Sequence, residues 1–332
     1  MCITASKDEG VSPTTADESL TQGYGSSSLR DLLTVVLLTY NCAHRIDVVL
    51  TRLCALGLPI IAVDNASNDH TVAVLRERPE VMAVPLPINI GAAGRNHGAA
   101  LSSTPYVIFC DDDGWWESEG LIDGVELLNG HARLAVLNAR ILVGESGRLD
   151  PISAEMADSP LADQDNIPGA VLMGFMAGAV MVRRSAFLEV GGYDQAFFMG
   201  GEEETLAFKF ARVDWHMRYF PALTVRHHPS LANAPHLRAH GMRNTLWNAW
   251  LHRRFASAVR WSIFILVDTP KNIDWLHGLA MTVRGIPWVM RRRRPMDAEL
   301  DAALGLLDRR RFAARRSVFN RADAMRALRK GT

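Results

Sequence analysis

The chain has 332 residues and is 48% hydrophobic, so it can bury a large core, either in one domain or in a domain with an appended region. Lys and Arg together number 36, as do Asp and Glu, so the formal net charge is zero. This balance excludes an overall field that would draw the protein onto nucleic acid or an anionic surface.

The first 30 residues contain no apolar segment of the kind that a signal peptide needs, and their composition predicts a disordered leader. The four cysteines form no CxxC pair, which is typical of a reduced, cytoplasmic protein rather than of a disulfide scaffold or a zinc site. The longest apolar run near the C-terminus, residues 261–267, is too short to span a bilayer.

Strand-like and helix-like segments alternate from residue 31 onward. A continuous apolar, β-branched run over residues 32–40 predicts a strand buried on both faces, and residues 45–56 have the apolar spacing of a helix. The next segments are a strand at 58–64, a helix at about 69–78, a strand at 80–87, a Gly-rich loop and helix at 89–103, and a strand at 105–111. This order predicts an α/β fold with a mostly parallel, Rossmann-like sheet and helices on both faces.

The second half of the chain is less regular. Its predicted elements are a strand at 134–143, a long loop at 144–169, a strand, short helix and turn at 174–194, a helix at 202–212 and a strand at 217–230. After about residue 235 the pattern is helical, amphipathic and rich in arginine. We therefore expect three parts, namely the leader (1–30), an α/β domain (31–235) and a basic helical region (236–332).

Polar side chains collect where the predicted parallel strands end. They are Thr39, Tyr40 and Asn41 after the first strand, Asp64 after the second, and Asp111, Asp112 and Asp113 after the fourth. Ligands of an open α/β sheet bind beyond the carboxyl ends of its strands. Capping and turns account for neighbours such as Asn65, but a turn needs one acidic residue and not three. We interpret the triple aspartate as functional.

Three adjacent carboxylates repel one another, so a fold that gathers them at a strand end needs a cation or a donor-rich ligand there. Mg²⁺ or Mn²⁺ typically takes one or two carboxylates and completes its shell with phosphate oxygens and water. The predicted ligand is therefore a metal–diphosphate. An EF-hand calcium site is excluded, because its loop spacing and late Glu are missing.

The segment from Asn89 to Gly98 is a second indication of a ligand. It contains neither GxGxxG nor a Walker lysine, so it lacks the signatures of the dehydrogenase and P-loop nucleotide sites. Its glycines permit close approach of the backbone to a ligand, with Arg95 as the contacting side chain. The alternative is that these glycines only pack a helix against a strand.

Taken together, these residues resemble the family 2 glycosyltransferases, nucleotide-sugar enzymes with the GT-A fold. The resemblance covers roughly residues 32–230 and follows VVLLTYN, IIAVDNASNDHT, NIGAAGRNHG, VIFCDDD, AGAVMVRRSAFLEVGGYDQAFFMGGEEE and VRHHPS in order. It implies hexosyl or deoxyhexosyl transfer from a nucleotide-diphosphate sugar to an acceptor hydroxyl, with Mg²⁺ or Mn²⁺ as cofactor. The nucleotide would belong to a UDP-, dTDP- or GDP-sugar.

The resemblance also implies roles for the residues of each motif. The nucleotide would contact Thr39, Tyr40, Asn41, Asp64, Arg95, Asp111 and Asp112. The metal would bind Asp113, Asp112 and His228, although the choice between His227 and His228 is open. Glu202 and Glu203 match the family's acidic pair, whose second member is the usual catalytic base. This sequence has Glu203 where Asp is common, so the choice among Glu202, Glu203 and Glu204 stays open.

The chemistry of the transfer needs only one protein carboxylate. A cation neutralises the negative charge that builds on the leaving β-phosphate, which replaces the general acid that a glycosidase needs. One general base then takes the proton from the acceptor hydroxyl, and Glu203 at a predicted helix start is the candidate. In-line attack from the opposite face would invert the anomeric centre.

Four further residues are candidates for a donor or acceptor pocket: Trp115, Trp116, Phe175 and Gly178. Of the two tryptophans, we expect one to stack on a sugar ring and the other to lie in the core. The placement of Phe175 and Gly178 follows from their order in the chain.

The basic helical region has three interpretations. It is a solvated face on helices packed against the core, an appended domain that shapes the acceptor pocket or mediates a homodimer, or a membrane-surface helix. The last would bring the enzyme to a lipid-linked acceptor; a small molecule and a glycan are the other acceptor classes. No nucleic-acid module is visible, so we expect no nucleic-acid partner.

Two other functions share this layout. A nicotinamide-dependent oxidoreductase would need GxGxxG, and three carboxylates at the phosphate edge would repel a pyrophosphate that carries no metal. A non-catalytic nucleotide-sugar-binding protein would keep the aspartates but would not need the acidic run from Glu202 to Glu204.

Overall fold

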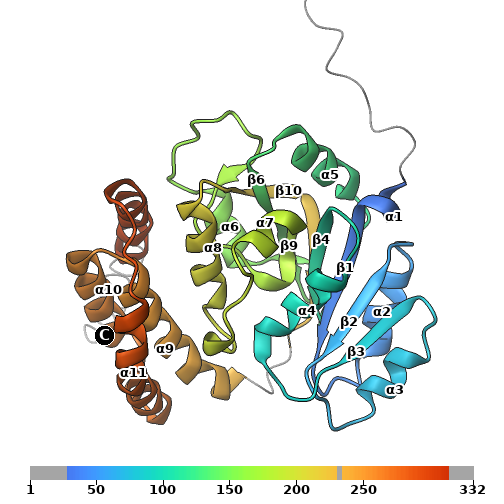
Figure 1. The fold of residues 1–332 in the computed structure, drawn as a ribbon, viewed down its shortest axis with the longest axis horizontal. Coiled ribbons are helices and arrows are strands. Elements are labelled where there is room, and N and C mark those ends of the chain that lie inside the picture. The colour runs from blue at the N-terminus through green and yellow to red at the C-terminus, as the bar shows by residue number, and fades with distance from the viewer. Residues whose placement is uncertain (1–27, 230–233, 314–332) are drawn as a thin grey trace, which may run out of the picture.

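The computed structural model of the protein describes residues 28–229 and 234–313. Most of the predicted leader lies outside the described residues, and its last two residues begin a short helix, α1 (Leu29–Leu32). Figure 1 shows a central sheet flanked by helices, with the C-terminal helices standing to one side of it.

The first half of the sheet is parallel, as the alternating sequence predicts. Four strands lie in the order β3-β2-β1-β4 and each pairs in parallel with its neighbour. Their bounds are β1 Leu33–Thr39, β2 Ile60–Asp64, β3 Val81–Pro85 and β4 Tyr106–Asp111. The helices that connect them are α2 (Ile46–Cys54), α3 (Thr71–Arg76) and, after the turn η1 (Gly91–Ala93), α4 (Gly94–Leu101).

The second half of the sheet is mixed. Strand β9 (Val180–Arg183) lies between β4 and β6 (Leu134–Val143) and runs antiparallel to both. Strand β10 (His216–His227) is parallel to β6, and β5 (Gly114–Trp116) pairs antiparallel with its end. Because β5 follows Asp113 directly, this pairing brings the end of β10 against the triple aspartate.

The segment 144–169 differs from the long loop that the sequence predicts. It contains the short strand β7 (Arg148–Leu149) and helix α6 (Pro151–Ala157), and strand β8 (Ala170–Val171) follows it. The Asp150 side chain caps α6 by accepting a hydrogen bond from the backbone N–H of Ile152 (2.9 Å). Asp150 followed by proline at the first helical position is a helix-start signal that the loop assignment overlooked.

Helices cover both faces of the sheet, as predicted. Val35 and Leu37 of β1 belong to one buried cluster, whereas the alternate residues Val36 and Leu38 belong to a second. This division follows from the two-residue period of a strand. The remaining helices of this half are α5 (Leu121–Gly130), α7 (Arg184–Glu189) and α8 (Glu202–Arg212), with the short turns η2 (Ala177–Ala179) and η3 (Gln195–Phe197).

The chain after residue 234 is helical, as predicted. It comprises α9 (Ala234–His252), α10 (Phe255–Asp268) and α11 (Ile273–Arg292), and residues 298–313 are also helical. Residues 298–313 reach the α/β part through a small cluster in which Leu304 packs with Phe208 of α8. Within the described residues, we find no helix with the length and apolarity that a membrane span requires.

Candidate functional site

The carboxyl ends of β1 and β2 are joined by buried hydrogen bonds. Asp64 is 1% exposed, and its carboxylate accepts from the Thr39 hydroxyl (3.0 Å) and from the backbone N–H and hydroxyl of Ser67 (2.8 and 2.5 Å). These bonds fix the turn that follows β2. The predicted contact of Thr39 and Asp64 with the nucleotide stays a prediction. A nucleobase that reaches Asp64 would have to share the carboxylate oxygens with Thr39 and Ser67.

The turn after β1 presents Tyr40 to solvent. The Tyr40 side chain is 40% exposed at the edge of the sheet, so its ring is available for stacking. Asn41 has a φ of +48°, in the left-handed region, and its backbone N–H donates to the Ser67 hydroxyl (2.8 Å). The Asn41 side-chain oxygen accepts from the backbone N–H of Asn68 (2.9 Å). Asn41 therefore shapes this turn through both its backbone and its side chain.

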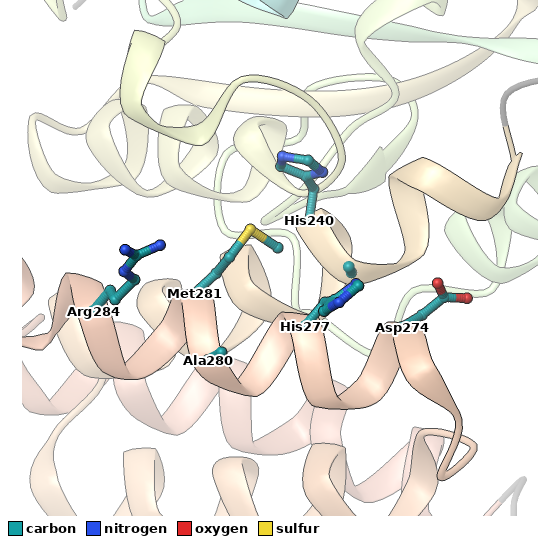
Figure 2. A pocket seen from close by; sticks show the side chains of 7 residues that line it. His240, Asp274, His277, Ala280, Met281 and Arg284 are labelled. Carbon is teal, nitrogen blue, oxygen red and sulfur yellow. The ribbon is translucent and has the colours of Figure 1, made fainter.

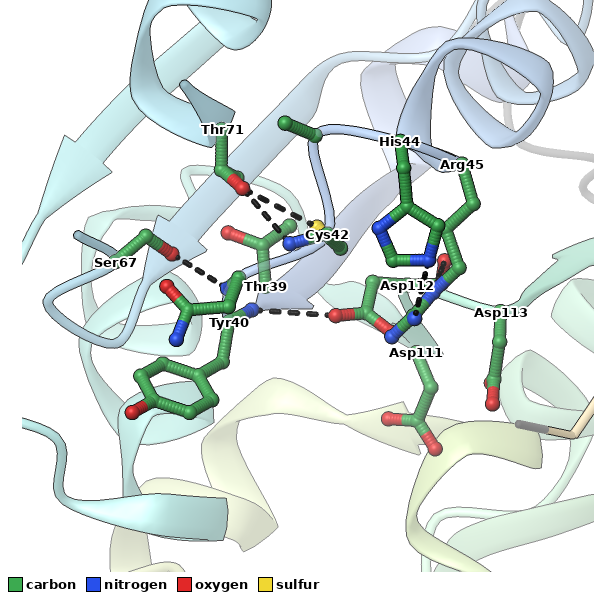
Figure 3. A network of polar contacts seen from close by, with 12 residues as sticks. Thr39, Tyr40, Cys42, His44, Arg45, Ser67, Thr71, Asp111, Asp112 and Asp113 are labelled. Carbon is green, nitrogen blue, oxygen red and sulfur yellow. Dashed lines mark hydrogen bonds and ion pairs between the residues drawn. The ribbon is translucent and has the colours of Figure 1, made fainter. Parts of the chain in front are cut away.

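Asp112 is paired with an arginine that the sequence analysis did not single out. Arg45, immediately before α2, donates to Asp112 Oδ1 (2.6 Å), and the Tyr40 backbone N–H donates to Asp112 Oδ2 (3.2 Å), as Figure 3 shows. Burial raises the pKa of Asp112, and the bonds from Arg45 and Tyr40 oppose that rise. Both oxygens of this carboxylate thus have protein partners.

Asp111 forms an ion pair with Arg95, the residue predicted to contact the nucleotide. Arg95 is 3% exposed and lies against the ring of Tyr193, 5.7 Å from its centroid. Burial opposes its charge, but the nearby acidic groups, Asp111 first, raise the pKa of the guanidinium above its usual value. On the other side of Asp111 is Gly178, where any Cβ would overlap with the Asp111 carboxylate.

Asp113 faces His227. The Asp113 Oδ1 to His227 Nε2 distance is 3.4 Å, and the bond to Asp113 raises the pKa of His227. His228, the residue assigned to the metal from the sequence, lies instead over Trp115 with ring centroids 4.8 Å apart. The difference has a simple cause, since consecutive side chains at a strand end point to opposite faces. The structure thus favours His227 as the partner of Asp113.

The three aspartates do not form a ready-made metal cage. Across residues 28–229 and 234–313, no group of three or more His, Cys, Asp or Glu side chains is arranged to hold a metal ion. Arg45 and Arg95 relieve part of the repulsion among the carboxylates. From the sequence alone, this relief was expected to come from a metal or another ligand. Of the predicted metal ligands, Asp113 has the His227 imidazole beside it at 3.4 Å, whereas the nearest carboxylate to His228 among the described residues is that of the exposed Glu145, at 3.8 Å.

The Gly-rich segment packs protein against protein. A Cβ at Gly94 would overlap with the Leu38 side chain, one at Gly98 with Val36, and one at Gly91 with the Phe198 carbonyl. The two glycines of α4 therefore let this helix approach β1 closely. This arrangement agrees with the alternative that the glycines pack a helix against a strand. It also fixes the position of Arg95 on the first turn of α4.

The three glutamates at the start of α8 face different surroundings. Glu204 accepts from Asn248 of α9 (3.2 Å) and lies 3.8 Å from the Arg253 guanidinium, so it faces the C-terminal helices. Glu202 is 3% exposed, and its Oε2 has no hydrogen-bond partner among the described residues. Glu203 is half-buried and accepts from the backbone N–H of Gly201 (3.2 Å). Burial raises the pKa of all three carboxyls.

Two of the predicted pocket residues lie in the core. Trp116 is 1% exposed and its indole N–H donates to the Phe109 carbonyl (2.9 Å), so it cannot stack on a sugar. Phe175 is 5% exposed and packs against Phe210, with ring centroids 6.4 Å apart. Trp116 is therefore the tryptophan of the two that lies in the core, and the half-exposed Trp115 stays a candidate for stacking on a sugar. The burial of Phe175 corrects its assignment to a ligand pocket.

The family's sequence profile, described as Glycosyl transferase family 2, matches residues 34–191 of the chain. This range contains the edge of β1, β2 and β4 together with all three aspartates. Residues 34–191 thus form a glycosyltransferase family 2 region. The protein is a glycosyltransferase, and this family supports transfer from a nucleotide sugar.

One curated relative is similar over most of its length. The N-acetylglucosaminyl-diphospho-decaprenol L-rhamnosyltransferase of Mycobacterium tuberculosis is 25% identical over 281 residues, which cover 71% of this chain and 90% of the relative.

Solved structures share the GT-A fold of this glycosyltransferase. S. aureus TarS 1-349 in complex with UDP has a TM-score of 0.51 at 15% identity, covering 79% of this chain and 83% of TarS. The mannosyltransferase PcManGT from Pyrobaculum calidifontis, in complex with GDP-Man and Mn²⁺, has a TM-score of 0.52 at 16% identity, covering 86% and 81%. At these identities the likeness concerns the fold.

Sequence reasoning missed the residues of the glycosyltransferase that position others. Asn244 and Asn248 of α9 are fully buried and donate to the carbonyls of Gly200 (2.6 Å) and Gly201 (2.7 Å), which directly precede the three glutamates. Nothing in a helical pattern marks such residues. Arg45 could have been found, because β1 and β4 are neighbours and a cation just after β1 lies close to acids just after β4.

The C-terminal helices contain two cavities away from the sheet edge. One, of about 330 Å³, lies between α9 and α11 and is lined by Ala239, His240, Asp274, His277, Ala280, Met281 and Arg284 (Figure 2). The other, of about 250 Å³, lies along a different side of α11 and is lined by Trp247, Trp250, Thr282, Ile286, Val289 and Met290. The His240 ring contacts the Phe198 ring (5.7 Å), so the first cavity adjoins the loop that leads to α8.

Proposed function

We propose that this glycosyltransferase moves a hexosyl or deoxyhexosyl group from a UDP-, dTDP- or GDP-sugar to an acceptor hydroxyl, with inversion at the anomeric carbon. The observation that carries the proposal is the place of buried Arg95. Its charge is stabilised by Asp111 at the strand edge and also by Glu202 and Glu203 at the start of α8. The donor-binding edge and the candidate bases therefore adjoin one another.

Glu203 is the proposed general base. Glu204 is also half-buried but faces Asn248 and Arg253, and Glu202 is almost fully buried, which leaves Glu203 as the candidate among the three. Its bond from Gly201 N–H and its place in the first turn of α8 hold the carboxylate in position. A base of this kind takes the proton from the acceptor hydroxyl as that oxygen attacks, and contributes roughly 10²–10⁴-fold to the rate.

Asp113 and His227 are the proposed protein ligands of a divalent cation. Mg²⁺ and Mn²⁺ accept a small number of protein ligands when phosphate oxygens and water complete the shell, so a carboxylate–imidazole pair fits this role. When bound, the cation would neutralise the charge that develops on the leaving diphosphate. Asp111 and Asp112 would then act differently, by orienting Arg95 and Arg45 at the same edge.

The nucleotide would lie along the ends of β1, β2 and β4. The exposed Tyr40 ring offers a stacking surface for the base, and the backbone around it is held by Asp112 and Ser67. Arg95 is too buried for its whole guanidinium to reach a ligand, but its Nε has no partner among the described residues. Because that Nε is itself buried, Arg95 would act on the donor by fixing the Asp111 carboxylate at the edge.

The acceptor is proposed to be lipid-linked and the enzyme to act at a membrane surface. The support comes from the relative whose name specifies L-rhamnosyl transfer to N-acetylglucosaminyl-diphospho-decaprenol, 90% of which is covered by the alignment. A deoxyhexosyl donor is therefore preferred among the candidates. A homodimer stays a separate prediction.

The test is donor turnover. The full-length protein would be incubated with each nucleotide sugar and with Mn²⁺, and release of the nucleoside diphosphate would be followed with and without a diphosphate-linked GlcNAc acceptor. We expect acceptor-dependent release, and NMR of the product is expected to show inversion. Binding of the nucleotide sugar without any release, in the presence of several acceptors, would favour the non-catalytic alternative.

A further inference from the structure

Helix α11 leaves a continuous apolar row exposed. Ile273, Leu276, Val283 and Met290 are 62, 56, 55 and 51% exposed, and Ala280 and Pro287 between them are exposed as well. The spacing of 3, 4, 3, 4 and 3 residues keeps all six on one side of a helix that is about 30 Å long. We call these six residues the α11 row.

The centre of the α11 row lies opposite the side of the helix that packs against α9, and Ala280 and Met290 at its margins also line the two cavities shared with α9. Gly278 and Val289 are the buried residues of α11, and Trp247 of α9 donates to the Thr282 carbonyl (3.2 Å). The inward positions are thus offset by about half a turn from the row. An exposed apolar surface this extended marks a site of contact with something outside the described chain.

A basic row runs beside the apolar one. His277, Arg284 and Arg291 each directly follow a member of the α11 row and recur at seven-residue intervals. All three are exposed. Figure 2 shows His277 and Arg284 on the flank of α11 that also carries Met281. Arg284 and Arg291 make no ion pair with any residue of 28–229 or 234–313. Residues 273–294 include five arginines and a single acidic residue, Asp274.

We propose that the α11 row docks the enzyme onto an anionic lipid bilayer, with the helix lying in the plane of the interface. An apolar face rimmed by arginines binds at the boundary of headgroups and acyl chains, and long side chains such as Arg284 reach the phosphates while their stems stay apolar. This deepens the proposed function, because it places the surface that would meet a lipid-linked acceptor.

Charge distinguishes an anionic bilayer from two other candidate partners of the α11 row, namely a second copy of α11 and residues 314–332 of the same chain. A second copy of α11 would bring one basic row against another, with a single aspartate on each side to balance it. Residues 314–332, which lie outside the described part, carry six Lys and Arg against one Asp, so they share the sign of the row. An anionic bilayer is the occupant with the complementary charge.

The geometry links docking to the active site. Helix α11 packs along α9, and α9 holds the carbonyls of Gly200 and Gly201 through Asn244 and Asn248. Gly200 and Gly201 directly precede α8, so their position sets where this helix begins and where Glu203 lies. A bilayer held by α11 is therefore separated only by α11 from α9, which positions the proposed base.

The test is cosedimentation of the full-length protein with vesicles of phosphatidylcholine mixed with phosphatidylglycerol, and with phosphatidylcholine alone. We expect binding to the anionic vesicles that weakens as salt is raised. Val283→Glu should lower the vesicle partition about tenfold or more, since it puts a charge in the buried part of the interface. Val48→Glu on α2, where Val48 is 58% exposed, is the matched control and should bind like the wild type.

A second pair tests the charges. Arg284→Glu combined with Arg291→Glu should lower the partition by roughly 25-fold, at about fivefold for each arginine near an anionic leaflet. Arg76→Glu, on exposed α3, should leave the partition unchanged. Equal losses in the Val48 or Arg76 controls, or no loss in the α11 variants, would overturn the assignment of this surface.

Two further outcomes would also overturn it. The first is no binding to anionic vesicles at low salt by a folded, monomeric protein. The second is a dimer, seen by light scattering, that Val283→Glu converts to monomer, since the row would then be a subunit interface. Donor hydrolysis is measured in parallel without lipid. A variant that loses vesicle binding but keeps hydrolysis separates the failure of docking from a failure of the proposed function.

Discussion

The edge of the sheet and the C-terminal helices satisfy their side chains in opposite ways. At the edge, Asp64, Asp111 and Asp112 all have hydrogen-bond or ion-pair partners within the chain. In the helices, an apolar row stays exposed on α11. The buried polar atoms without a partner among the described residues include both ring nitrogens of His252 and the hydroxyls of Ser257 and Ser262.

This contrast has a physical meaning. A site that binds a small charged ligand gains from groups whose positions are already fixed, because little reorganisation is needed when the ligand arrives. A surface that meets a bilayer or a large partner needs apolar area and charge rather than fixed geometry. The first region therefore matches donor binding and the second matches docking.

The largest effect that sharpens this contrast is expected for Glu203→Gln. The variant keeps the shape of the side chain but cannot accept the proton of the acceptor, so kcat should fall roughly 10²–10⁴-fold. Donor binding, measured as a thermal shift with nucleotide and Mn²⁺, should be unchanged. Glu204→Gln is the matched control, because its carboxylate faces Asn248. An inactive Glu202→Gln beside an active Glu203→Gln would move the base to Glu202.

The next effect concerns the two histidines at the end of β10. Loss of a residue that only hydrogen-bonds to a metal ligand typically weakens metal binding roughly 10–100-fold. His227→Ala, which removes a proposed direct ligand, should weaken Mn²⁺ binding by at least as much. His228→Ala removes the stacking on Trp115 and a contact with the exposed Glu145, and it should leave metal affinity within a few-fold of the wild type. Isothermal titration of Mn²⁺ in the presence of nucleoside diphosphate measures both. The reverse order of effects would return the role to His228.

The packing of the edge can be broken by one methyl group. Gly98→Ala would push a Cβ into the Val36 side chain, so α4 must shift, at a cost of about 1–3 kcal/mol in the free energy of unfolding. Because α4 carries Arg95, nucleotide affinity should fall as well. Gly130→Ala, where no atom lies near the new Cβ, is the control for the loss of glycine. Urea unfolding of both variants checks the expectation, and equal stability would contradict the close packing.

The smallest effect is a pH dependence of stability. Burial raises the pKa of Glu202, so the folded state binds a proton more tightly than the unfolded state does. Glu202 thus stabilises the fold at pH values below its unfolded pKa, and this contribution is lost as the pH rises through the folded pKa. Glu202→Gln should flatten that part of the curve of melting temperature against pH. An unchanged slope would mean that the Glu202 carboxylate is solvated.

Much of the fold could be predicted from the sequence, because buried parallel strands and amphipathic helices have distinct periods. The strands β1, β2 and β4 follow directly from apolar runs that end in polar residues. The antiparallel place of β9 could not be predicted, since its four residues contain no information on direction. Helix α6 was missed for a different reason, because its polar surroundings hid the Asp-Pro start signal.

The sequence was enough to predict which motifs form the candidate site, but not which side chains pair with each of its carboxylates. The triple aspartate indicated a charged site, yet which cation balances each carboxylate depends on pairs far apart in sequence, such as Arg45 and Asp112. The two tryptophans show the same limit. Strand alternation places one in the core and one outside, but it does not say which until β5 is seen to pair with β10.

The most direct test of the account is the titration of UDP and dTDP into the protein with and without Mn²⁺, for the wild type and for Asp113→Asn. We expect the wild type to bind a nucleoside diphosphate far more tightly when Mn²⁺ is present and Asp113→Asn to lose this gain. Equal affinity with and without metal in the wild type would contradict the assignment of the sheet edge as a metal–diphosphate site.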